Sequence, residues 1–358
     1  MSNLNDIVNI NINIAAPAVD SADFDNLLIV GPPPRVAPAR PLPTVGVYSD
    51  LSEVTAAGYV AVGDDADPVG IAARIAFSQN PRPARVFIAA QQPDKTPVET
   101  LEAALETSGW YVICAAGIAE SEYERMAEWT EAQTRQFAYT FLSDTDPVSD
   151  IYFRSHGWCG LITDDDLPAD VPDANGYVHV AAVAKCLAFP SGSETWNLKT
   201  VAAVFPSRIS STLRRRFDDG NSNFVSRIAG RNVTRNGMTR GGEWIDVIRG
   251  RDWLENDMQL RVFNLLLVNP KIPFTDNGIA LVRNAMIASL EAARERGIVA
   301  EDEYDADGNP VPGFVTSVPL SASLTETQRA SRVLTGCTFS ARLAGAIHAV
   351  RVDGTLTF

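Results

Sequence analysis

Residues 85–115 have the sequence RVFIAAQQPDKTPVETLEAALETSGWYVICA, and this stretch decides the class of fold. Residues 85–89 and 110–115 are short apolar runs, and residues 97–107 between them carry apolar side chains at helical spacing. Two strands separated by a helix of this length are typical of parallel strands joined by a crossover helix. The stretch therefore predicts an α/β sheet.

The same alternation of strands and helices extends outward over residues 44–190. The further strand candidates are residues 45–48, 138–142 and 158–162, and the helix candidates are residues 68–79, 120–136 and 177–187. Because the strands are spaced by helices throughout, we predict one layered α/β domain with a mainly parallel sheet.

The pattern changes after residue 190. Residues 252–267 and 276–296 place apolar side chains on one stripe of a helix each. Short strands are predicted at residues 223–228, 243–247 and 338–347. We predict that residues 191–345 form a second domain of the α+β class.

Both ends of the sequence alternate apolar and polar residues, which is the pattern of a strand with one apolar face. The apolar positions are Val8, Ile10, Ile12, Ile14, Val350, Val352, Leu356 and Phe358. A one-sided strand at a chain end offers unpaired backbone groups to any neighbour. We therefore interpret residues 1–20 and 346–358 as arms that add strands to other copies of the chain. Such arms indicate an assembly protein.

A proline-rich stretch follows the first arm. Prolines at positions 32–34, 38, 41 and 43 fix the backbone and remove hydrogen-bond donors. Residues 21–43 are therefore expected to form an extended connector between the arm and the first domain.

Bulk composition limits the class of protein. The chain has 358 residues, enough for two domains, and a formal net charge of −14, which argues against a general nucleic-acid binder. Cys114, Cys159, Cys186 and Cys337 form no CxxC pair and are expected to be buried, reduced thiols of a cytoplasmic protein. The N-terminus has no signal-peptide pattern, and no apolar run reaches the roughly 20 residues of a membrane span.

The sequence offers little support for catalysis, a metal or a cofactor. His156, His179 and His348 lie in no HExxH motif and beside no GxSxG nucleophile, and phosphate-binding glycine motifs are missing from the sequence. Residues 305–309 look like the start of a calcium loop, but the later ligands are absent, which favours a solvated turn. We expect a protein that is not an enzyme; a hydrolase on the α/β domain is the less favoured alternative.

Residues 236–253, NGMTRGGEWIDVIRGRDW, resemble the C-terminal domain of contractile tail sheath proteins from bacteriophages and related injection machines. Residues 341–350, ARLAGAIHAV, are similar to the last strand of the compact branch of that family, and residues 7–14 are similar to its first strand. Residues 76–83 resemble a segment of its first domain. The likeness thus extends over nearly the whole chain as a diffuse pattern.

This resemblance implies a subunit of a helical cylinder around an inner tail tube. In the family, terminal arms add strands to neighbouring subunits, and contraction drives the tube through a cell envelope. The α/β domain is then the outer domain and the α+β domain faces the tube. The implied partners are other copies of the chain, the inner tail tube protein, and baseplate and tail-terminator proteins, without direct nucleic-acid contact or membrane insertion. The implied location is the virion tail, assembled in the bacterial host cytoplasm.

Residues 208–251 carry ten arginines against four acidic residues. Three interpretations of these arginines are open: ion pairs within the chain, a nucleic-acid site, or a face that meets an acidic partner surface. The negative net charge of the chain weakens the nucleic-acid interpretation. We predict charged contacts with neighbouring subunits or the tube at Arg214, Arg215, Arg216, Arg283, Arg294 and Arg296. A non-contracting tube or capsid component that polymerises by terminal strands remains the structural alternative.

Overall fold

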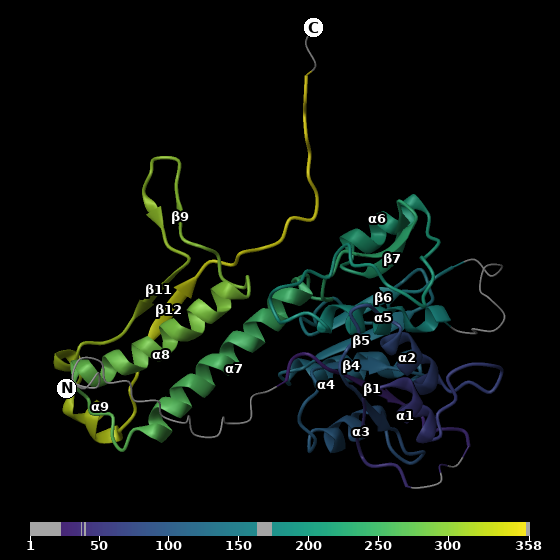
Figure 1. Cartoon of the computed structure of the whole chain (residues 1–358), viewed down its shortest axis with the longest axis horizontal. Helices are drawn as coiled ribbons and strands as arrows, with labels where there is room; N and C mark the ends of the chain where they lie inside the picture. Colours follow the sequence, from purple (N-terminus) through teal and green to yellow (C-terminus); the bar gives the residue numbers. More distant parts are fainter. Residues whose placement is uncertain (1–22, 37, 39–40, 163–173, 356–358) are drawn as a thin grey trace, which may run out of the picture. The chain divides into compact units, whose positions relative to one another are not determined.

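A computed structural model describes residues 23–36, 38, 41–162 and 174–355. The chain divides into two compact units (Figure 1). In the described residues, the large unit contains residues 23–254, 290–314 and 341–355, and the small unit contains residues 255–289 and 315–340. The domain limits expected from the sequence stay a prediction.

An eight-stranded sheet forms the centre of the large unit. Its strands, in spatial order, are β2 (Gly46–Tyr48), β3 (Val86–Ala90), β1 (Leu27–Gly31), β4 (Val112–Ala115), β5 (Gln136–Phe141), β6 (Ser155–Cys159), β7 (Asn223–Ile228) and β8 (Arg231–Arg235). The six inner strands are parallel, and only β2 and β8, one at each edge, are antiparallel to their neighbours. The predicted mixed α/β fold with a mainly parallel sheet is confirmed.

Strand β1 corrects one prediction. Residues 27–31 were assigned to the extended connector, but they lie between β3 and β4, with Ile29 opposite both Ile88 and Cys114. All five residues of β1 are buried, as expected for a central parallel strand covered on both faces. A Cβ atom at Gly31 would lie 2.1 Å from the carbonyl oxygen of Ala116, so this glycine permits close packing of neighbouring backbone.

Six α-helices lie wholly within the described part of the large unit: α1 (Leu51–Ala56), α2 (Pro68–Phe77), α3 (Pro97–Ala104), α4 (Tyr123–Glu131), α5 (Val178–Leu187) and α6 (Ser211–Asp219). Helix α3 begins with a capping box between Thr96 and Glu99, with Pro97 in its first turn. Helices α3 and α4 pack with Leu28 and Val30 in one core, and α2 and α5 pack on each other and on the sheet. Leu27 and Ile29 point to the opposite face from Leu28 and Val30, because successive residues of a strand alternate between faces, and they are also buried. Both faces of the sheet are therefore covered.

The sheet continues past residue 190. Strand β7 pairs with β6, with Asn223 opposite Trp158, and β8 follows it as a hairpin. The strand predicted at residues 243–247 is wrong, because helix α7 (Ile245–Val268) begins within it. An isolated bridge between Met238 and Trp244 and a hydrogen bond from the N–H of Thr239 to the carbonyl oxygen of Glu243 close the glycine-containing turn before this helix.

Two long helices, α7 and α8 (Asp276–Glu295), each place much of their length in the small unit, close to the two helices predicted from the apolar stripes. The small unit also holds α9 (Glu326–Ser331) and most of a two-stranded sheet of β11 (Phe314–Ser317) and β12 (Thr338–Ala341). The predicted strand over residues 338–347 is thus confirmed only in its first half. A short hairpin of β9 (Glu303–Tyr304) and β10 (Pro310–Val311) belongs to the large unit.

Candidate assembly interface

The sheet of the small unit has open edges. Strands β11 and β12 pair with each other, and neither has another strand partner within the part of the chain that the structure describes. Both strands also leave apolar side chains exposed, namely Val315 on β11 and Phe339 on β12. Each free edge presents backbone N–H and C=O groups that an added strand would satisfy.

An apolar groove of about 530 Å³ lies between α7, α8 and the segment that leads into β12. The residues that line it are Met258, Val262, Leu266, Ile272, Pro273, Phe274, Gly278, Ile279, Val282, Met286, Arg332, Val333, Leu334, Cys337 and Phe339. Five of these, Met258, Val262, Ile279, Val282 and Met286, belong to the apolar stripes that predicted the helices. In a single copy, these stripe residues therefore border an open groove, although Ile279 and Met286 are themselves buried.

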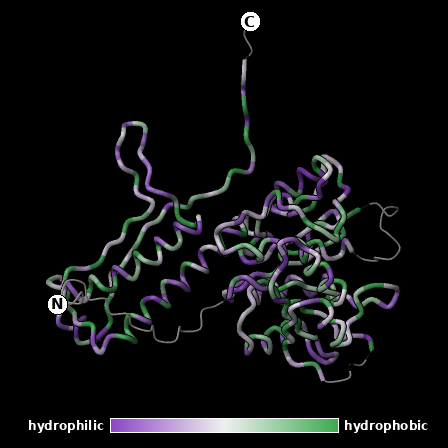
Figure 2. The backbone as a smooth tube through the Cα atoms, in the orientation of Figure 1, coloured by the Kyte–Doolittle hydropathy of each residue, from purple (hydrophilic) through white to green (hydrophobic). Residues whose placement is uncertain are grey.

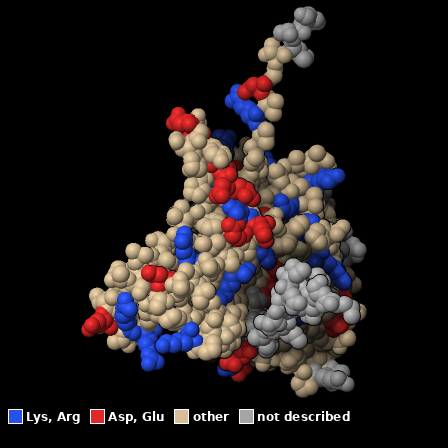
Figure 3. Space-filling view, turned by 60° about the vertical axis from the view of Figure 1, so that its left-hand side comes forward, with Lys and Arg blue, Asp and Glu red and all other residues tan. Residues whose placement is uncertain are grey.

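The end of α7 adds to the exposed apolar surface. Phe263, Leu266, Leu267 and Val268 each leave about half or more of their surface in solvent. Figure 2 shows hydrophobic residues along both long helices of the small unit, and in Figure 3 uncharged residues cover much of the face turned forward. An apolar surface of this kind is typical of a protein–protein contact.

The C-terminal segment was predicted to be a strand without a partner in its own subunit. Its described residues include Val350 and Val352, whose exposed fractions are 75% and 83%. Residues 349–355 form no strand in the structure. The other predicted pairing residues, Val8, Ile10, Ile12, Ile14, Leu356 and Phe358, lie outside the described residues, so pairing with another copy stays a prediction.

Five of the six predicted contact arginines have partners in their own chain, and three of these five lie on α8 or directly after it. Arg283 donates from Nε to Thr316 Oγ1 at 3.1 Å, which links α8 to β11. Arg294 forms ion pairs with Glu291, Glu301 and Asp302. The guanidinium of Arg296 lies 4.2 Å from the ring centre of Trp253. These contacts account for the three side chains within one copy, and their predicted role between subunits is untested.

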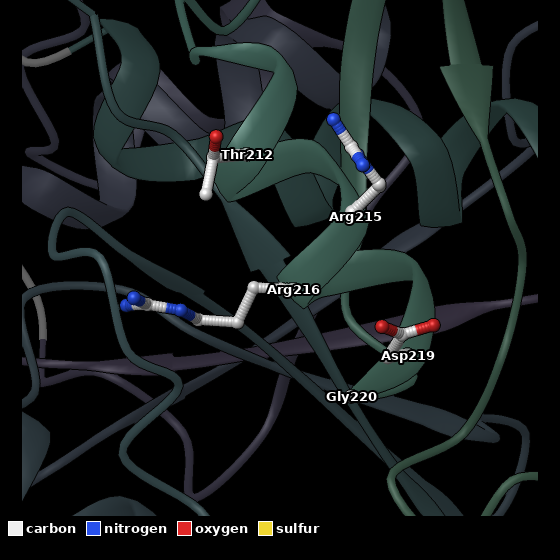
Figure 4. A pocket seen from close by; sticks show the side chains of 5 residues that line it. All are labelled: Thr212, Arg215, Arg216, Asp219 and Gly220. Carbon is white, nitrogen blue, oxygen red and sulfur yellow. The ribbon is translucent and has the colours of Figure 1, made fainter.

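Helix α6 carries the other three arginines on the surface of the large unit. Arg214 lies over the ring of Phe224, and Arg216 forms an ion pair with Asp144 at 3.3 Å. Thr212, Arg215, Arg216, Asp219 and Gly220 line a hollow of about 570 Å³ (Figure 4). Among the described residues, no ionic partner is found for Arg215. Arg215 is therefore the predicted contact arginine with most freedom to meet another molecule.

Two further arginines of the basic segment are buried and structural. Arg240 donates to the carbonyl oxygen of Val148 and pairs with Asp146. Arg249 pairs with Glu194 and Asp25 and also donates to the carbonyl oxygens of Phe24, Cys186 and Phe189. The basic segment thus includes arginines of a surface helix, arginines in internal ion pairs, and exposed arginines of the β7–β8 hairpin such as Arg227 and Arg231.

Two histidines and three cysteines are packing residues of the large unit. His156 accepts a hydrogen bond from Trp158 Nε1 at 2.9 Å, and His179 Nδ1 lies 2.8 Å from Thr140 Oγ1. Burial lowers the pKa of both imidazoles to about 3, so they are neutral near pH 7. The predicted buried thiols are confirmed for Cys114, Cys159 and Cys186, whereas Cys337 is half-buried in the groove.

The acidic turn at residues 305–309 uses its carboxylate internally. Asp305 Oδ1 accepts hydrogen bonds from the backbone N–H groups of Asp307 and Asn309, at 2.9 and 2.8 Å. The described ranges contain no cluster of three or more His, Cys, Asp or Glu side chains suited to a metal ion. None of the described helices is long and apolar enough to cross a membrane.

Residues 245–356 match the family model described as "E217 tail sheath protein gp31-like, C-terminal domain". This match begins at the first residue of α7 and includes α8, the β11–β12 sheet and the described C-terminal segment. A comparison with curated protein sequences finds no match.

Solved structures of contractile machines share the fold of the chain. The chain is similar to one in the anti-feeding prophage (AFP) baseplate, with 13% identity, 98% of each chain covered and a TM-score of 0.69. It is also similar to the sheath of an extracellular contractile injection system (PVC) in the contracted state, with 11% identity, 97% of this chain and 96% of that chain covered, and a TM-score of 0.66.

A sheath tail protein from Desulfitobacterium hafniense is similar at 8% identity, with 86% of this chain and 93% of that chain covered and a TM-score of 0.57. At such low identity these structures establish the fold alone. Together with the sequence match of the C-terminal region, they confirm the resemblance to contractile tail sheath proteins.

Sequence patterns missed part of this surface. Val333 and Leu334 line the groove, but they follow neither a helical nor a strand period over a useful length. Arg332 has a positive φ of 58° at the end of α9, which turns the chain toward the groove. Only the folded arrangement of α7, α8 and this segment brings these residues together.

Proposed function

We propose that this chain is the structural subunit of a contractile tail sheath, polymerising into a helical cylinder around an inner tail tube and contracting to drive the tube through a cell envelope. The observation that carries this proposal is the match of residues 245–356 to a tail sheath C-terminal domain. The shared fold of the whole chain with the AFP and PVC proteins supports it.

Strand addition to the β11–β12 sheet is the proposed means of assembly. Each strand of this pair has one free edge among the described residues, and the C-terminal segment leaves Val350 and Val352 exposed. The same two-residue alternation occurs at residues 8–14. An arm of one copy that joins the sheet of another would satisfy backbone groups on both sides.

The apolar groove supports the same proposal energetically. An added strand with one apolar face would cover side chains of α7 and α8 that one copy leaves in solvent. Fully burying a Val, Ile or Phe side chain contributes roughly 1.5–3 kcal/mol. Two arms with several such residues would contribute on the order of 10 kcal/mol before the cost of ordering them.

The geometry of strand donation also fits a helical polymer. A donating arm and an accepting sheet are different surfaces of one subunit, so the contact is head-to-tail and need not close into a ring. Joints of backbone hydrogen bonds hold while the subunit bodies move, which is what contraction requires. The inner tube, the baseplate and the tail-terminator proteins are the proposed partners, and the tail of a virion or injection machine is the proposed location.

A non-enzymatic role agrees with the sequence and fold comparisons. The chain is similar to structural proteins of contractile machines, and His156 and His179 serve in packing. The proposal therefore assigns the chain no catalytic step.

Electron microscopy of the purified chain tests the proposal. The full chain should form wide hollow tubes, and versions that lack residues 1–14 or 350–358 should stay folded and form none. A double variant, V350D with V352D, should behave like the second truncation, because it places two charges on the apolar face. The control R351Q with D353N changes the other face of the same segment and should keep the tubes. Tubes of normal length from both truncated chains would refute strand addition.

A further inference from the structure

The segment that leads into the C-terminal arm is fixed to the large unit at its beginning. The N–H of Arg342 donates to the carbonyl oxygen of Gly313 at 2.8 Å, and the N–H of Ala300 donates to the carbonyl oxygen of Arg342 at 2.8 Å. The N–H of Ala344 donates to the carbonyl oxygen of Ile298 at 3.1 Å. Residues 342–344 thus continue the chain along the surface of their own subunit.

The segment is fixed a second time at His348. Its Nε2 and the Oγ1 of Thr195 share a hydrogen bond of 2.7 Å. Its ring meets the ring of Trp244 edge-on, with centroids 4.6 Å apart and planes at 86°. Thr195 and Trp244 both belong to the large unit, and Trp244 directly precedes helix α7.

His348 stands out from its neighbours in burial. Within residues 343–355, all of which the structure describes, His348 is the one residue that is not exposed. Ile347 on one side has 83% of its surface exposed, although it is the more hydrophobic residue. The segment therefore contacts the large unit through a polar aromatic side chain with two specific partners, and its aliphatic side chains remain free.

We propose that His348, held by Thr195 and Trp244, is an anchor that fixes the point at which the C-terminal arm leaves its subunit. This inference rests on the proposed function in one respect, namely that the arm beyond His348 pairs with another copy. The anchor itself is a property of the single chain.

The anchor limits the length of the free arm and the volume that the end of the arm can sample. Residues 349–355 span about 23 Å when extended at about 3.3 Å per residue. Without the anchor, the free chain would begin near residue 345, and its end would sample a larger volume. A fixed exit point raises the effective concentration of the arm at a correctly placed neighbour and reduces the freedom lost on pairing. His348 is thus a positioning residue for assembly.

Spin labelling of the full chain, kept below its assembly concentration, tests the anchor directly. Cys337 is replaced by serine, because it is the one half-buried thiol among the four cysteines, and a label is placed at A346C or at V352C. In the parent chain the label at position 346 should be clearly less mobile than the label at position 352. H348A should raise the mobility at position 346 clearly toward that at position 352.

Three further variants separate anchoring from a general structural effect. T195V removes the hydrogen bond and should raise the mobility at position 346 in part. H348F keeps an aromatic ring against Trp244 and should likewise give an intermediate result. I347A changes the exposed neighbour and should leave the mobility unchanged. All of them should keep the urea midpoint of the large unit, because the contacts lie outside its core.

Assembly provides the second measurement. H348A should raise the concentration needed for tube formation about tenfold, whereas I347A should not. Equal label mobility at positions 346 and 352 in the parent chain, or an unchanged mobility in both H348A and T195V, would overturn the anchor. A parent chain that shows the mobility difference but forms no tubes would instead contradict the proposed function and leave the anchor standing.

Discussion

Arg249 and Glu194 form an ion pair that is closed to solvent, with both side chains 0% exposed and Nη1 and Oε1 2.5 Å apart. The pair joins the first turns of α7 to the loop after α5, and the remaining donors of Arg249 are satisfied by Asp25 and by backbone carbonyl oxygens. A buried cation with this many partners fixes the start of α7 to the large unit.

Arg249→Met should therefore destabilise the large unit strongly. The substitution leaves Glu194 buried without its cation, which costs about 3–5 kcal/mol. Urea unfolding followed by the fluorescence of the buried Trp110, Trp158 and Trp196 measures this free energy. The exposed Arg215 provides the control, since Arg215→Met should change the free energy of unfolding by less than about 0.5 kcal/mol. Equal effects of the two substitutions would contradict this account of the pair.

Asp246 predicts a pH dependence of stability. Burial, and then the nearby Glu194, raise the pKa of this carboxyl from its ordinary value of 3.8 to about 7. Its Oδ1 atom is buried and makes no hydrogen bond within the structure. Because the folded state holds this proton more tightly than the unfolded state, its contribution to stability is complete below about pH 4 and is lost as the pH rises toward 7.

Asp246→Asn should remove this loss. At pH 4 the variant and the parent should unfold at similar urea concentrations, and at pH 8 the variant should be more stable by a few kcal/mol. Glu255→Gln, an exposed change on the same helix, should keep the pH profile of the parent. A variant that is less stable than the parent at pH 8 would show that the Asp246 carboxylate stabilises the fold.

The groove predicts an effect on assembly that is separate from stability. Val333 lines the groove and has an exposed fraction of 58%, and Val62 in the large unit has the same exposed fraction. Val333→Asp should prevent or strongly weaken tube formation, because an arm that covers the groove would bury the new charge. Val62→Asp is the matched control and should assemble normally. Tube formation is scored by electron microscopy and sedimentation, with circular dichroism as the test of folding.

Charge reversal at α6 tests the predicted basic contact. Arg215→Glu should weaken assembly about two- to fivefold, since an exposed ion pair contributes about 0–1 kcal/mol and a like-charge contact adds repulsion. The effect should shrink as the salt concentration rises. Lys95→Glu makes the same change of charge at an exposed loop position and should have little effect. If both variants assemble like the parent at low salt, Arg215 does not face a neighbouring subunit or the tube.

Local sequence patterns predicted most of the secondary structure of the large unit. Strand β3, helix α3 and strand β4 appear where residues 85–115 place them, because apolar runs, a capping box and an initial proline act over a few residues. The two long helices near the C-terminus were equally visible from their apolar stripes. The start of α7 was missed, because the charged residues Arg249 and Asp252 occupy buried positions there and interrupt the apolar stripe.

The sequence by itself determined the α/β class, the position of most strands and helices and the alternation of apolar and polar residues at both ends, since each depends on near neighbours in the chain. Only the tertiary structure decided that β1 lies in the centre of the sheet, that the stripes of α7 and α8 border an open groove and that His348 meets Thr195 and Trp244. These features bring together residues far apart in the sequence, such as Thr195 and His348, which are 153 positions apart. Local sequence patterns cannot predict such contacts, because they form only when the sheet, the helices and the C-terminal segment pack together.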